Sequence, residues 1–599
     1  MARVKIGTLV TLGLLFCLSV VLYVQLTTVP VAPLKQPSMS SQTALLTDPF
    51  LQAPTKSSVR VVWFTEFEGS DHRVIYGPSH QTVVATTTQL SRTREDAQSK
   101  TAQPYDQVTE RPIWRHEANI TDLRSGLRVP YFVVSTPVNG NPIRSNQFTL
   151  GALPPAGQSL QILLTSDHQL MPMTAANLQK VQETVGQVDG VFLAGDLVNI
   201  PDRASEWFDD VRGGAFFPCL QGRGRYTLKK GNTRTVYKGG QLIQSAPLFT
   251  ALGNHEVMGR YSTTVGLGEQ FNDPVPWNAA KSLYNQHEKA FNPTNTIQVK
   301  QRWLKNHSFN IDTYNEIFSL PKTPRGDGQT QRYYATTFGD VRLVSLYVTQ
   351  IWRKYVINDE TRGRYQERIA DLDNPTNWGH GHMIFESIEP GNPQYEWLKE
   401  ELASEAFQQA KYKVVMLHHP PHSLGGNIVP AFTTPVPVYD QDDDGNLTGI
   451  RYEYPKQEDH IVKHLLPLLE EAGTHLVFYG HSHLWNRFES DSGVQFLESS
   501  NVGNSYGAHT ADNPRPVPKD KRYKETYAAI GDPNGLRPIM PTLAPLLDDT
   551  GRPMPYIASN DVTAFSILDT GTGLVSSYYF DTRQPQSQVV RFDEFKIGQ

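Results

Sequence analysis

The sequence predicts an α/β protein that is preceded by a smaller all-β region and by an apolar N-terminal segment. Three features indicate this: an uncharged apolar run near the start, a hundred residues of short alternating strands, and then apolar strands that alternate with helical segments. The chain has 599 residues, more than one hydrophobic core normally supports, so we expect several domains. The predicted boundaries are residues 1–28 for a signal anchor, 29–56 for a flexible linker, 57–153 for the all-β domain and 158–599 for the α/β domain with long inserts.

The composition excludes several classes of protein. A formal net charge of −5 gives no reason to expect nucleic acid as a partner. The two cysteines, Cys17 and Cys219, cannot form a disulfide framework or a thiolate zinc site. The 44 glycines and 42 prolines favour long loops and strands over a helical bundle.

The N-terminal segment predicts attachment to a membrane. Residues 6–26 carry no charge and, as a helix, would cover about 30 Å, the thickness of a bilayer core. Arg3 and Lys5 precede this run, which orients the body of the protein outside the cytoplasm. We therefore expect a transmembrane helix that anchors an extracytoplasmic (periplasmic or cell-surface) protein, the alternative being a secreted protein whose signal is cleaved. Residues 29–56 are rich in Pro, Ser, Thr and Gln and are interpreted as a tether.

The middle of the chain predicts two different layer arrangements. Short alternating runs at 59–67, 73–77, 114–123, 129–136 and 145–153 are separated by turn residues, which is typical of a small antiparallel sandwich. From residue 160 onward, apolar strands alternate with helical segments at 174–188, 393–407 and 458–473. Alternation of this kind predicts α/β layers with the sheets inside.

Polar side chains follow five of the apolar strands at the point where each strand ends. These side chains are Asp167, Asp196, Asn254 with His255 and Glu256, His418 with His419, and His481 with His483. Ligands gather beyond the carboxyl ends of strands in open α/β sheets, so we expect one shared pocket. Carboxylate, amide oxygen and imidazole suit Fe, Mn or Zn, and there are enough donors for two ions if one carboxylate bridges them. Two ions about 3.5–4 Å apart can hold a bridging hydroxide and clamp a phosphoryl group, which indicates hydrolysis of phosphoesters.

Four ordered motifs carry a family resemblance. "GDLVN", "GNHE", "HHPP" and "GHSH", in this order after the Asp167 strand, resemble those of the calcineurin-like metallophosphoesterases, nearest to the purple acid phosphatase branch. The resemblance covers roughly residues 58–500. It implies a β-sandwich flanked by helices, a preceding fibronectin-III-like domain, and acid phosphatase-like cleavage of a phosphorylated small molecule, with phosphomonoesters favoured.

The resemblance also implies a role for each site residue. Asp167, Asp196 and His483 would hold one metal, and Asn254, His418 and His481 would hold the second together with Asp196 as the bridge. His255 would bind phosphate or protonate the leaving oxygen, beside Asp196 and Asn254 as the other catalytic residues.

Two positions depart from the family pattern. Asn199 stands where the purple enzymes have tyrosine, so there is no phenolate to colour an iron site. Gln169 stands where non-purple relatives have histidine. Either Gln169 coordinates through its oxygen, or His168 turns inward, or solvent completes the first site; we favour Gln169 because alternate strand residues share the face of Asp167.

Other readings of the function and of single motifs stay open. The first alternative is a phosphodiesterase of the same fold. The second is a non-catalytic surface binding protein with a degenerate metal pocket, and the number of metal ions bound per chain distinguishes such a protein from the enzyme.

Asp440, Asp442 and Asp444 match the start of a calcium loop, although Arg451 replaces the closing glutamate; the alternative is a solvated acidic turn. A basic β-hairpin is predicted over residues 222–243. Among the remaining histidines, His419, His422 and His475 are expected to pack or to contact the ligands from behind, whereas His380 and His382 lie on a loop able to reach the pocket.

Overall fold

The computed structural model describes residues 44–324, 329–353, 363–427, 431–510, 513–514, 535–548 and 550–598. The predicted anchor and the first part of the predicted linker lie outside these residues. Within the described residues, no helix combines the length and the apolar character that crossing a membrane requires. Residues 45–599 form one unit by their contacts.

The region before residue 152 is built from two antiparallel sheets that share one core, as the alternating pattern predicts. The first sheet has the order β1 (Phe50–Gln52), β2 (Val59–Thr65), β8 (Trp114–Ile120) and β5 (Thr86–Gln89). The second has the order β10 (Ile143–Arg144), β9 (Arg128–Thr136), β3 (Asp71–Tyr76) and β4 (Gln81–Val84), with β11 (Phe148–Gly151) also on β9. Trp63 from the first sheet and Tyr131 from the second are both fully buried in the shared core. A likeness to fibronectin III domains stays a prediction.

The predicted linker, residues 29–56, extends too far toward the C-terminus, because β1 (Phe50–Gln52) lies within it. Phe50 and Leu51 are buried, and β1 pairs with β2 in antiparallel register. The apolar Phe50 side chain packs with Phe64 and Phe217, so this segment gains more from burial than a solvated tether would.

The α/β region contains a first sheet of six strands. Its order is β16 (Leu248–Thr250), β13 (Gly190–Leu193), β12 (Gln161–Thr165), β31 (Val562–Asp569), β32 (Leu574–Asp581) and β33 (Val590–Lys596). The first three strands are parallel, and the C-terminal three join antiparallel to β12. Every residue of β13 and β16 is buried, which fits their nearly continuous apolar sequences.

A second sheet of eight strands completes the region. Its order is β19 (Tyr334–Phe338), β20 (Val341–Ser345), β21 (Tyr412–Met416), β24 (Leu476–Tyr479), β26 (Gln495–Ser499), β25 (Trp485–Glu489) and β27 (Arg537–Pro538), with β30 (Tyr556–Ile557) also on β25. The strands β20, β21, β24 and β26 are parallel to one another.

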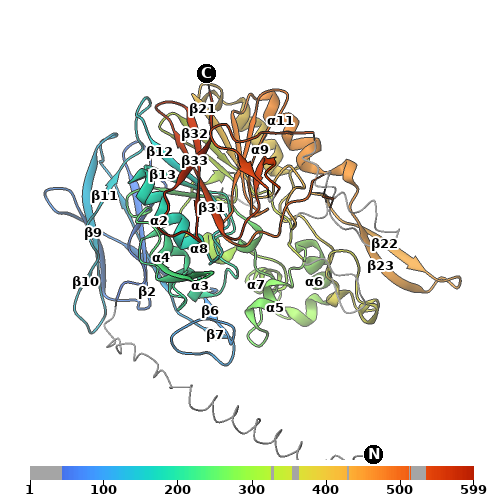
Figure 1. Cartoon of the computed structure of the whole chain (residues 1–599). Coiled ribbons are helices and arrows are strands. Elements are labelled where there is room, and N and C mark those ends of the chain that lie inside the picture. Colours follow the sequence, from blue (N-terminus) through green and yellow to red (C-terminus); the bar gives the residue numbers. More distant parts are fainter. Residues whose placement is uncertain are drawn as a thin grey trace, which may run out of the picture. The chain divides into compact units, whose positions relative to one another are not determined.

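The two sheets face each other across the main core, and helices lie outside them (Figure 1). Leu163 and Phe192 of the first sheet share this core with Met416 and Phe478 of the second. The other face of the second sheet is covered by α9 (Pro393–Ala403) and α11 (Leu466–Glu471), which follows a π-helical turn (Ile461–Leu465). Helix α2 (Thr174–Val185) packs beside β31. This arrangement confirms the predicted α/β sandwich with helices on its outside.

Inserts between the core strands carry the remaining elements. They are α3 (Ala204–Phe208), α4 (Phe216–Leu220), the β14 (Tyr226–Lys230) and β15 (Thr233–Tyr237) hairpin, η1 (Asn254–Glu256), α5 (Leu267–Phe271), α6 (Trp277–Phe291), α7 (Ile297–His307), α8 (Asp312–Ile317), α10 (Glu405–Gln408) and the β22 (Val436–Gln441) and β23 (Leu447–Glu453) hairpin. There are also the short strand pairs β6 (Arg94–Glu95) with β7 (Thr109–Glu110), β17 (Thr323–Pro324) with β18 (Gln329–Thr330), and β28 (Leu546–Leu547) with β29 (Pro553–Met554), and the 3₁₀ helices η2 (Ile369–Asp371), η3 (Pro375–Asn377) and η4 (Lys456–Glu458). The β14–β15 register confirms the predicted hairpin over residues 222–243, with Lys230 paired to Asp561.

Candidate metal centre

The carboxyl ends of five parallel strands from the two sheets meet at one place. Strands β12, β13 and β16 are followed by Asp167, Asp196 and Asn254, and Asn254 opens η1. Strands β21 and β24 are followed by His418 and His481. Parallel strands present their carboxyl ends at the same edge, so residues far apart in sequence come together here.

The ligand atoms of this cluster lie within a few ångströms of one another. His418 Nε2 lies 3.3 Å from Asp196 Oδ1 and 3.2 Å from Asn254 Oδ1. His483 Nε2 lies 3.3 Å from Asp167 Oδ1. Two groups have ligand atoms that all fall within 4.8 Å of one another: Asp167 with Asp196 and His483, and His418 with His419 and His481. All members of both groups are buried.

Several site residues hold a strained backbone conformation. The φ angles are 59° at Asp167, 56° at Asp196, 74° at His481 and 57° at His483, in the left-handed region that residues with a Cβ rarely adopt. Such conformations cost about 1–3 kcal/mol each and persist only where the surroundings enforce them. Four such conformations at one edge of the sheets indicate that the surrounding structure holds these residues in place for function, at a cost in local stability.

Glycines at the start of two motifs permit the close approach of the strand ends. A Cβ at Gly253 would lie 2.2 Å from Asp196 Oδ1, and one at Gly480 would lie 2.3 Å from Asp167 Oδ2. No carbon atom is accommodated at such distances from an oxygen, so a side chain at either position would displace a carboxylate.

Glu256 ties the Asp196 loop to the Asn254 loop. Its buried carboxylate accepts hydrogen bonds from the backbone N–H groups of Asp196 at 2.9 Å, Leu197 at 2.7 Å and Gly253 at 2.7 Å. Burial and the neighbouring Asp196 charge raise the pKa of Glu256 to about 8, against the effect of these donors. The sequence places Glu256 at the end of the "GNHE" motif but did not predict this positioning role.

The electrostatics of the cluster favour a positive charge between its carboxylates. Burial opposes ionisation of Asp196, but His418 and His255 outweigh it and lower the pKa of this carboxyl. Burial likewise opposes a charge on His418, but Asp196 and Asp167 outweigh it and raise the pKa of the imidazole to about 10. A cation at this position would replace the proton on His418 and satisfy the same carboxylates.

Gln169 faces the cluster and His168 does not. Gln169 Nε2 lies 3.1 Å from Asp196 Oδ2, while its Oε1 accepts a hydrogen bond from Asn504 Nδ2 at 3.3 Å. The His168 ring packs on Phe216, and its Nε2 lies 3.0 Å from Thr165 Oγ1. The alternative in which His168 turns toward the metal site is therefore wrong. Coordination of a metal by Gln169 stays a prediction.

His255 is held with one ring nitrogen turned toward the cluster. Its backbone N–H donates to Asp196 Oδ1 at 2.9 Å, and its Nδ1 donates to the carbonyl of Asn199 at 2.8 Å. Its Nε2 lies 4.0 Å from Asp196 Oδ2, and the ring stacks on Phe271. With Nδ1 bound to a carbonyl, Nε2 is the nitrogen available to a ligand.

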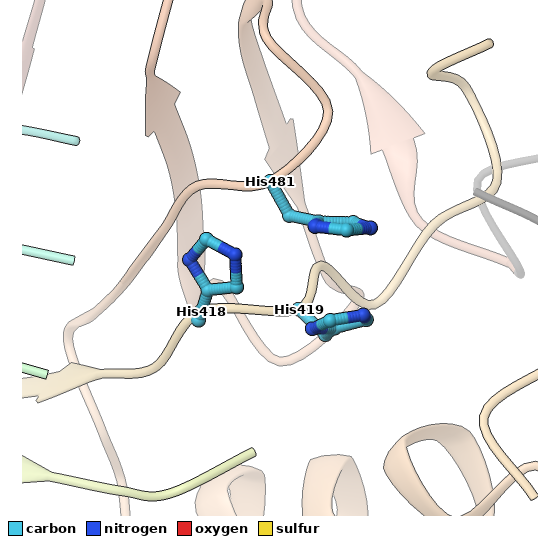
Figure 2. Close-up of side chains that lie close together, drawn as sticks. All are labelled: His418, His419 and His481. Carbon is cyan, nitrogen blue, oxygen red and sulfur yellow. The ribbon is translucent and has the colours of Figure 1, made fainter. Parts of the chain in front are cut away.

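His419 joins the second group, in addition to the predicted residues. Its ring stacks on that of His481 (Figure 2). The ring centroids are 3.8 Å apart and the ring planes differ by 22°. Imidazole lone pairs lie in the ring plane, so two stacked rings do not aim at the same ion. Both ring nitrogens of buried His419 have no hydrogen-bond partner within the described part of the chain.

The remaining histidines divide between packing and the pocket. His422 lies 3.5 Å from Glu498, and His475 accepts the backbone N–H of Lys413 at 3.2 Å, which fits the predicted packing roles. His382 is buried near His481 and His419, whereas His380 lines a separate cavity of about 380 Å³ beside Trp378. Only one residue of this predicted loop pair therefore reaches the cluster.

The predicted calcium loop is a hairpin turn between β22 and β23. Asp440 is engaged by Arg451 at 2.7 Å, across the hairpin. The Asp442 carboxylate instead accepts hydrogen bonds from the backbone of Asp444 and Asn446. Among the described residues, neither group of side chains able to share a metal contains these aspartates. The calcium prediction is not supported, because Arg451 in place of the closing glutamate takes the charge that a cation would need.

Comparison with known proteins agrees with this geometry. The profile of calcineurin-like phosphoesterases matches residues 160–484. The chain belongs to the calcineurin-like phosphoesterase family. This confirms the resemblance carried by the four motifs, and it makes the protein a member of a family of hydrolases that act on phosphorylated substrates.

The fold of this chain is similar to that of a solved purple acid phosphatase. A purple acid phosphatase, PPD1, from yellow lupin (Lupinus luteus) seeds is 15% identical, with a TM-score of 0.51, over 92% of this chain and 74% of that one. GAP50, the anchor in the inner membrane complex of Plasmodium, is 11% identical over 73% of this chain and 90% of that one, with a TM-score of 0.28. No curated protein matches the chain with significance.

The residues present fit the divalent metals that the family implies. Carboxylate, amide and imidazole donors converge, all buried, and two groups of them have the spacing of metal ligands. Asn504, which no sequence motif marks, supports both Gln169 and His483. Its Nδ2 donates to Gln169 Oε1, and its backbone carbonyl accepts a hydrogen bond from His483 Nδ1 at 3.0 Å. Such a contact fixes the tautomer that leaves Nε2 facing a metal.

Proposed function

We propose that this protein is a binuclear metal-dependent phosphomonoesterase, similar in action to the acid phosphatases. Asp167, Gln169, Asp196 and His483 would hold one ion, and Asp196, Asn254, His418 and His481 the other. The observation that carries the proposal is the convergence of five strand ends on two adjacent groups of ligand atoms. The ions would be Fe, Mn or Zn, which suit this donor set.

The metal pair supplies an activated water and neutralises phosphoryl oxygens when it is bound. Asp196 is oriented for its bridging role by the N–H of His255, which fixes one carboxylate oxygen. Glu256 in turn fixes the backbone of Asp196, so the bridge is held before any ligand arrives. Burial of the whole set excludes bulk water and strengthens each charge interaction.

His255 is the residue placed to move a proton. Its Nδ1 is committed to the Asn199 carbonyl, which leaves Nε2 to donate to a phosphate oxygen or to the leaving oxygen. Its side chain is 16% exposed, unlike the fully buried Asp196, so a substrate can reach it.

Asn199 occupies the position at which the purple enzymes have a tyrosine, so this chain has no phenolate there to bind iron. Its Nδ2 donates to the backbone carbonyl of Gln169 at 2.7 Å, which is a positioning contact and not a metal contact. We expect metal-loaded protein to show no tyrosinate-to-iron absorption band even when iron is bound.

The location of the enzyme rests on the sequence alone. The uncharged run at residues 6–26 and the preceding positive charges support an anchored, extracytoplasmic enzyme. Recovery of full-length protein in the soluble fraction after cell lysis, with its N-terminus intact, would contradict this assignment.

The test of the activity compares the wild type with Asp196→Asn and Asn254→Ala on a panel of mono- and diesters, with Mn, Zn or Fe supplied. We expect kcat/KM on monoesters to fall by roughly 10³-fold or more in both variants, because each removes a metal ligand. Asp443→Asn, in the exposed β22–β23 turn, is the matched control and should keep full activity. Near-normal turnover by either site variant would refute the assignment. A preference for diesters would show that the protein is a phosphodiesterase and not a phosphomonoesterase.

A further inference from the structure

A buried carboxylate lies beneath the loop that carries His481 and His483. This loop connects β24 to β25, and in the sheet β26 lies between these two strands. Glu498 of β26 is in register with Tyr479 of β24 on one side and with Asn486 of β25 on the other. The side chain of Glu498 is fully buried. The loop therefore crosses over the strand that carries this carboxylate.

Both oxygens of the Glu498 carboxylate bind Ser482, the residue between the two histidines. Oε1 accepts the backbone N–H of Ser482 at 2.9 Å, and Oε2 accepts its hydroxyl. Ser500 Oγ donates to Oε1 at 2.6 Å, and Asn486 Nδ2 donates to Oε2 at 2.6 Å. Each oxygen thus has two donors, which hold the carboxylate in one orientation, so Ser482 is bound at two points of a fixed group.

The same carboxylate also contacts the loop that carries His418. His422 follows His418 in the "HHPPH" motif, and its Nε2 lies 3.5 Å from Glu498 Oε2. The Nδ1 of His422 accepts the backbone N–H of Leu424 at 3.1 Å, so the neutral ring carries its hydrogen on Nε2, the nitrogen near Glu498. One buried carboxylate therefore lies against both histidine-bearing loops of the second sheet.

The backbone of the loop needs support at this position. His481 and His483 both have φ in the left-handed region, at 74° and 57°. Residues with a Cβ hold this conformation only where the surrounding structure enforces it. Ser482 lies between them and is the residue that Glu498 binds, so the contact acts where the backbone is strained.

The first sheet has a matching arrangement. Glu256 accepts the backbone N–H groups of Asp196 and Gly253 and so joins two ligand-bearing loops. Each sheet thus supplies one buried carboxylate that fixes the loops carrying its ligands.

We propose that Glu498 is a positioning residue of the metal centre, which aims the imidazoles of His481 and His483 through its hold on Ser482. This inference rests on the proposed function, in which His483 serves one ion and His481 the other. Since Ser482 lies between the two ligands, loss of the hold weakens the binding of both ions.

Titration of the full-length, metal-free protein with Zn²⁺ gives a readout that does not depend on turnover. Calorimetry at 25 °C measures a dissociation constant for each ion. Ser482→Ala removes the hydroxyl that Oε2 accepts and keeps the backbone N–H on Oε1. We expect both dissociation constants to rise roughly 10-fold in this variant, as for other residues that orient metal ligands.

Variants at Glu498 extend the series. We expect Glu498→Ala to raise both dissociation constants by up to about 100-fold. Glu498→Gln keeps an oxygen for the N–H of Ser482 and should recover part of the affinity. Ser482→Ala leaves Ser500 and Asn486 paired with the carboxylate, so it decides the test if a Glu498 variant does not fold.

Ser499→Ala is the matched control, because it likewise removes one buried hydroxyl beside Glu498. The hydroxyl of Ser499 accepts a hydrogen bond from Ser566 Oγ of the first sheet at 3.3 Å, away from the ligand loop. We expect this variant to bind both ions as the wild type does.

Thermal unfolding separates positioning from a purely structural role. Zn²⁺ should raise the Tm of the wild type more than that of Ser482→Ala, because the variant binds the ions less tightly. A structural role would lower the Tm of the metal-free protein and leave the dissociation constants of the folded protein unchanged. Constants within about threefold of the wild type for either ion, in both Ser482→Ala and Glu498→Gln, overturn the proposal.

The two proposals fail in different ways. Wild-type protein that binds two ions and cleaves phosphoesters, with unchanged affinity in the variants, removes the role of Glu498 and leaves the proposed function intact. Metal-loaded wild type that cleaves no phosphoester removes the proposed function, whereas the Zn²⁺ titration still decides whether Glu498 positions the ligands.

Discussion

At the scale of single residues, Asp196 is the point on which the contacts of the metal centre converge. His255 donates to it, Gln169 and His418 lie within 3.3 Å of it, and Glu256 holds its backbone. The sequence predicted Asp196 and its partner ligands because a polar residue after an apolar strand marks a strand end. It placed Glu256 at a strand end but did not predict that its carboxylate holds the Asp196 backbone, and it did not predict Asn504, because these roles depend on contacts across long stretches of chain that no local pattern encodes.

Gly480→Ala tests how tightly the strand ends must approach. The added methyl would lie 2.1 Å from Ser166 Oγ and 2.3 Å from Asp167 Oδ2, so we expect Asp167 to be displaced. Metal affinity at the first site should fall roughly 10–100-fold, and the free energy of unfolding should fall by about 1–3 kcal/mol. Metal titration and chemical denaturation measure both. Gly268→Ala is the control, since nothing lies within 4 Å of its Cβ position, and unchanged metal binding in Gly480→Ala would contradict the account.

At the scale of elements, the parallel strands of two sheets deliver the ligands, and the two-sheet region before residue 152 packs on the same core. Phe64 of β2 contacts Phe208 and Phe217 of the α/β region, and Tyr131 donates to the carbonyl of Gln244 at 2.7 Å. The alternation of polar and apolar residues predicted the longer strands of the two-sheet region before residue 152. It could not predict that β1 belongs to the same sheets, because a strand of three residues is too short to show a periodic pattern.

A buried histidine in β8 makes the stability of this element depend on pH. His116 stacks on His72 at 3.6 Å, and its ring nitrogens contact the hydroxyls of Thr65 and Thr87. Burial, with the charges of His72 and Arg115 adding to it, lowers the pKa of His116 to about 3. The folded pKa lies below the unfolded value, so the stability from this residue is full above pH about 6.5 and is lost as pH falls toward 3.

We expect the free energy of unfolding to fall by about 1–2 kcal/mol between pH 6.5 and 5 because of His116. His116→Gln cannot titrate, so its unfolding curve should lose that part of the pH dependence. Denaturant unfolding at several pH values, followed by tryptophan fluorescence, provides the measurement. Equal pH slopes for the wild type and the variant would show that folding does not lower the pKa of His116.

At the scale of the whole molecule, the chain returns at its C-terminus to complete the sheet that holds the first metal ligands. Strand β31 pairs with β12, the strand that leads to Asp167, and β32 and β33 extend the sheet beyond it. This stretch was predicted to belong to the α/β domain, but its strands were not predicted, since pairing with a strand some four hundred residues away leaves no local signal.

We therefore expect that a protein without residues 562–599 does not fold, whereas loss of a peripheral segment would leave a shorter folded protein. The loss exposes the buried edge and faces of β12, so we expect insoluble protein on expression. Deletion of residues 1–43 is the control, and we expect that protein to fold, because residues 45–599 form one unit by their contacts. Solubility and circular dichroism of the two truncated chains are the readouts. A soluble, folded and metal-binding 1–561 fragment would contradict the role assigned to the C-terminal strands.

Anomalous diffraction from crystals grown with Mn or Zn tests the central claim most directly. We expect two anomalous peaks per chain about 3.5–4 Å apart, with Asp196 between them, Asp167 and His483 beside one, and Asn254, His418 and His481 beside the other. Peaks located elsewhere, or none among these side chains at saturating metal, would contradict the claim that the strand ends form a binuclear centre.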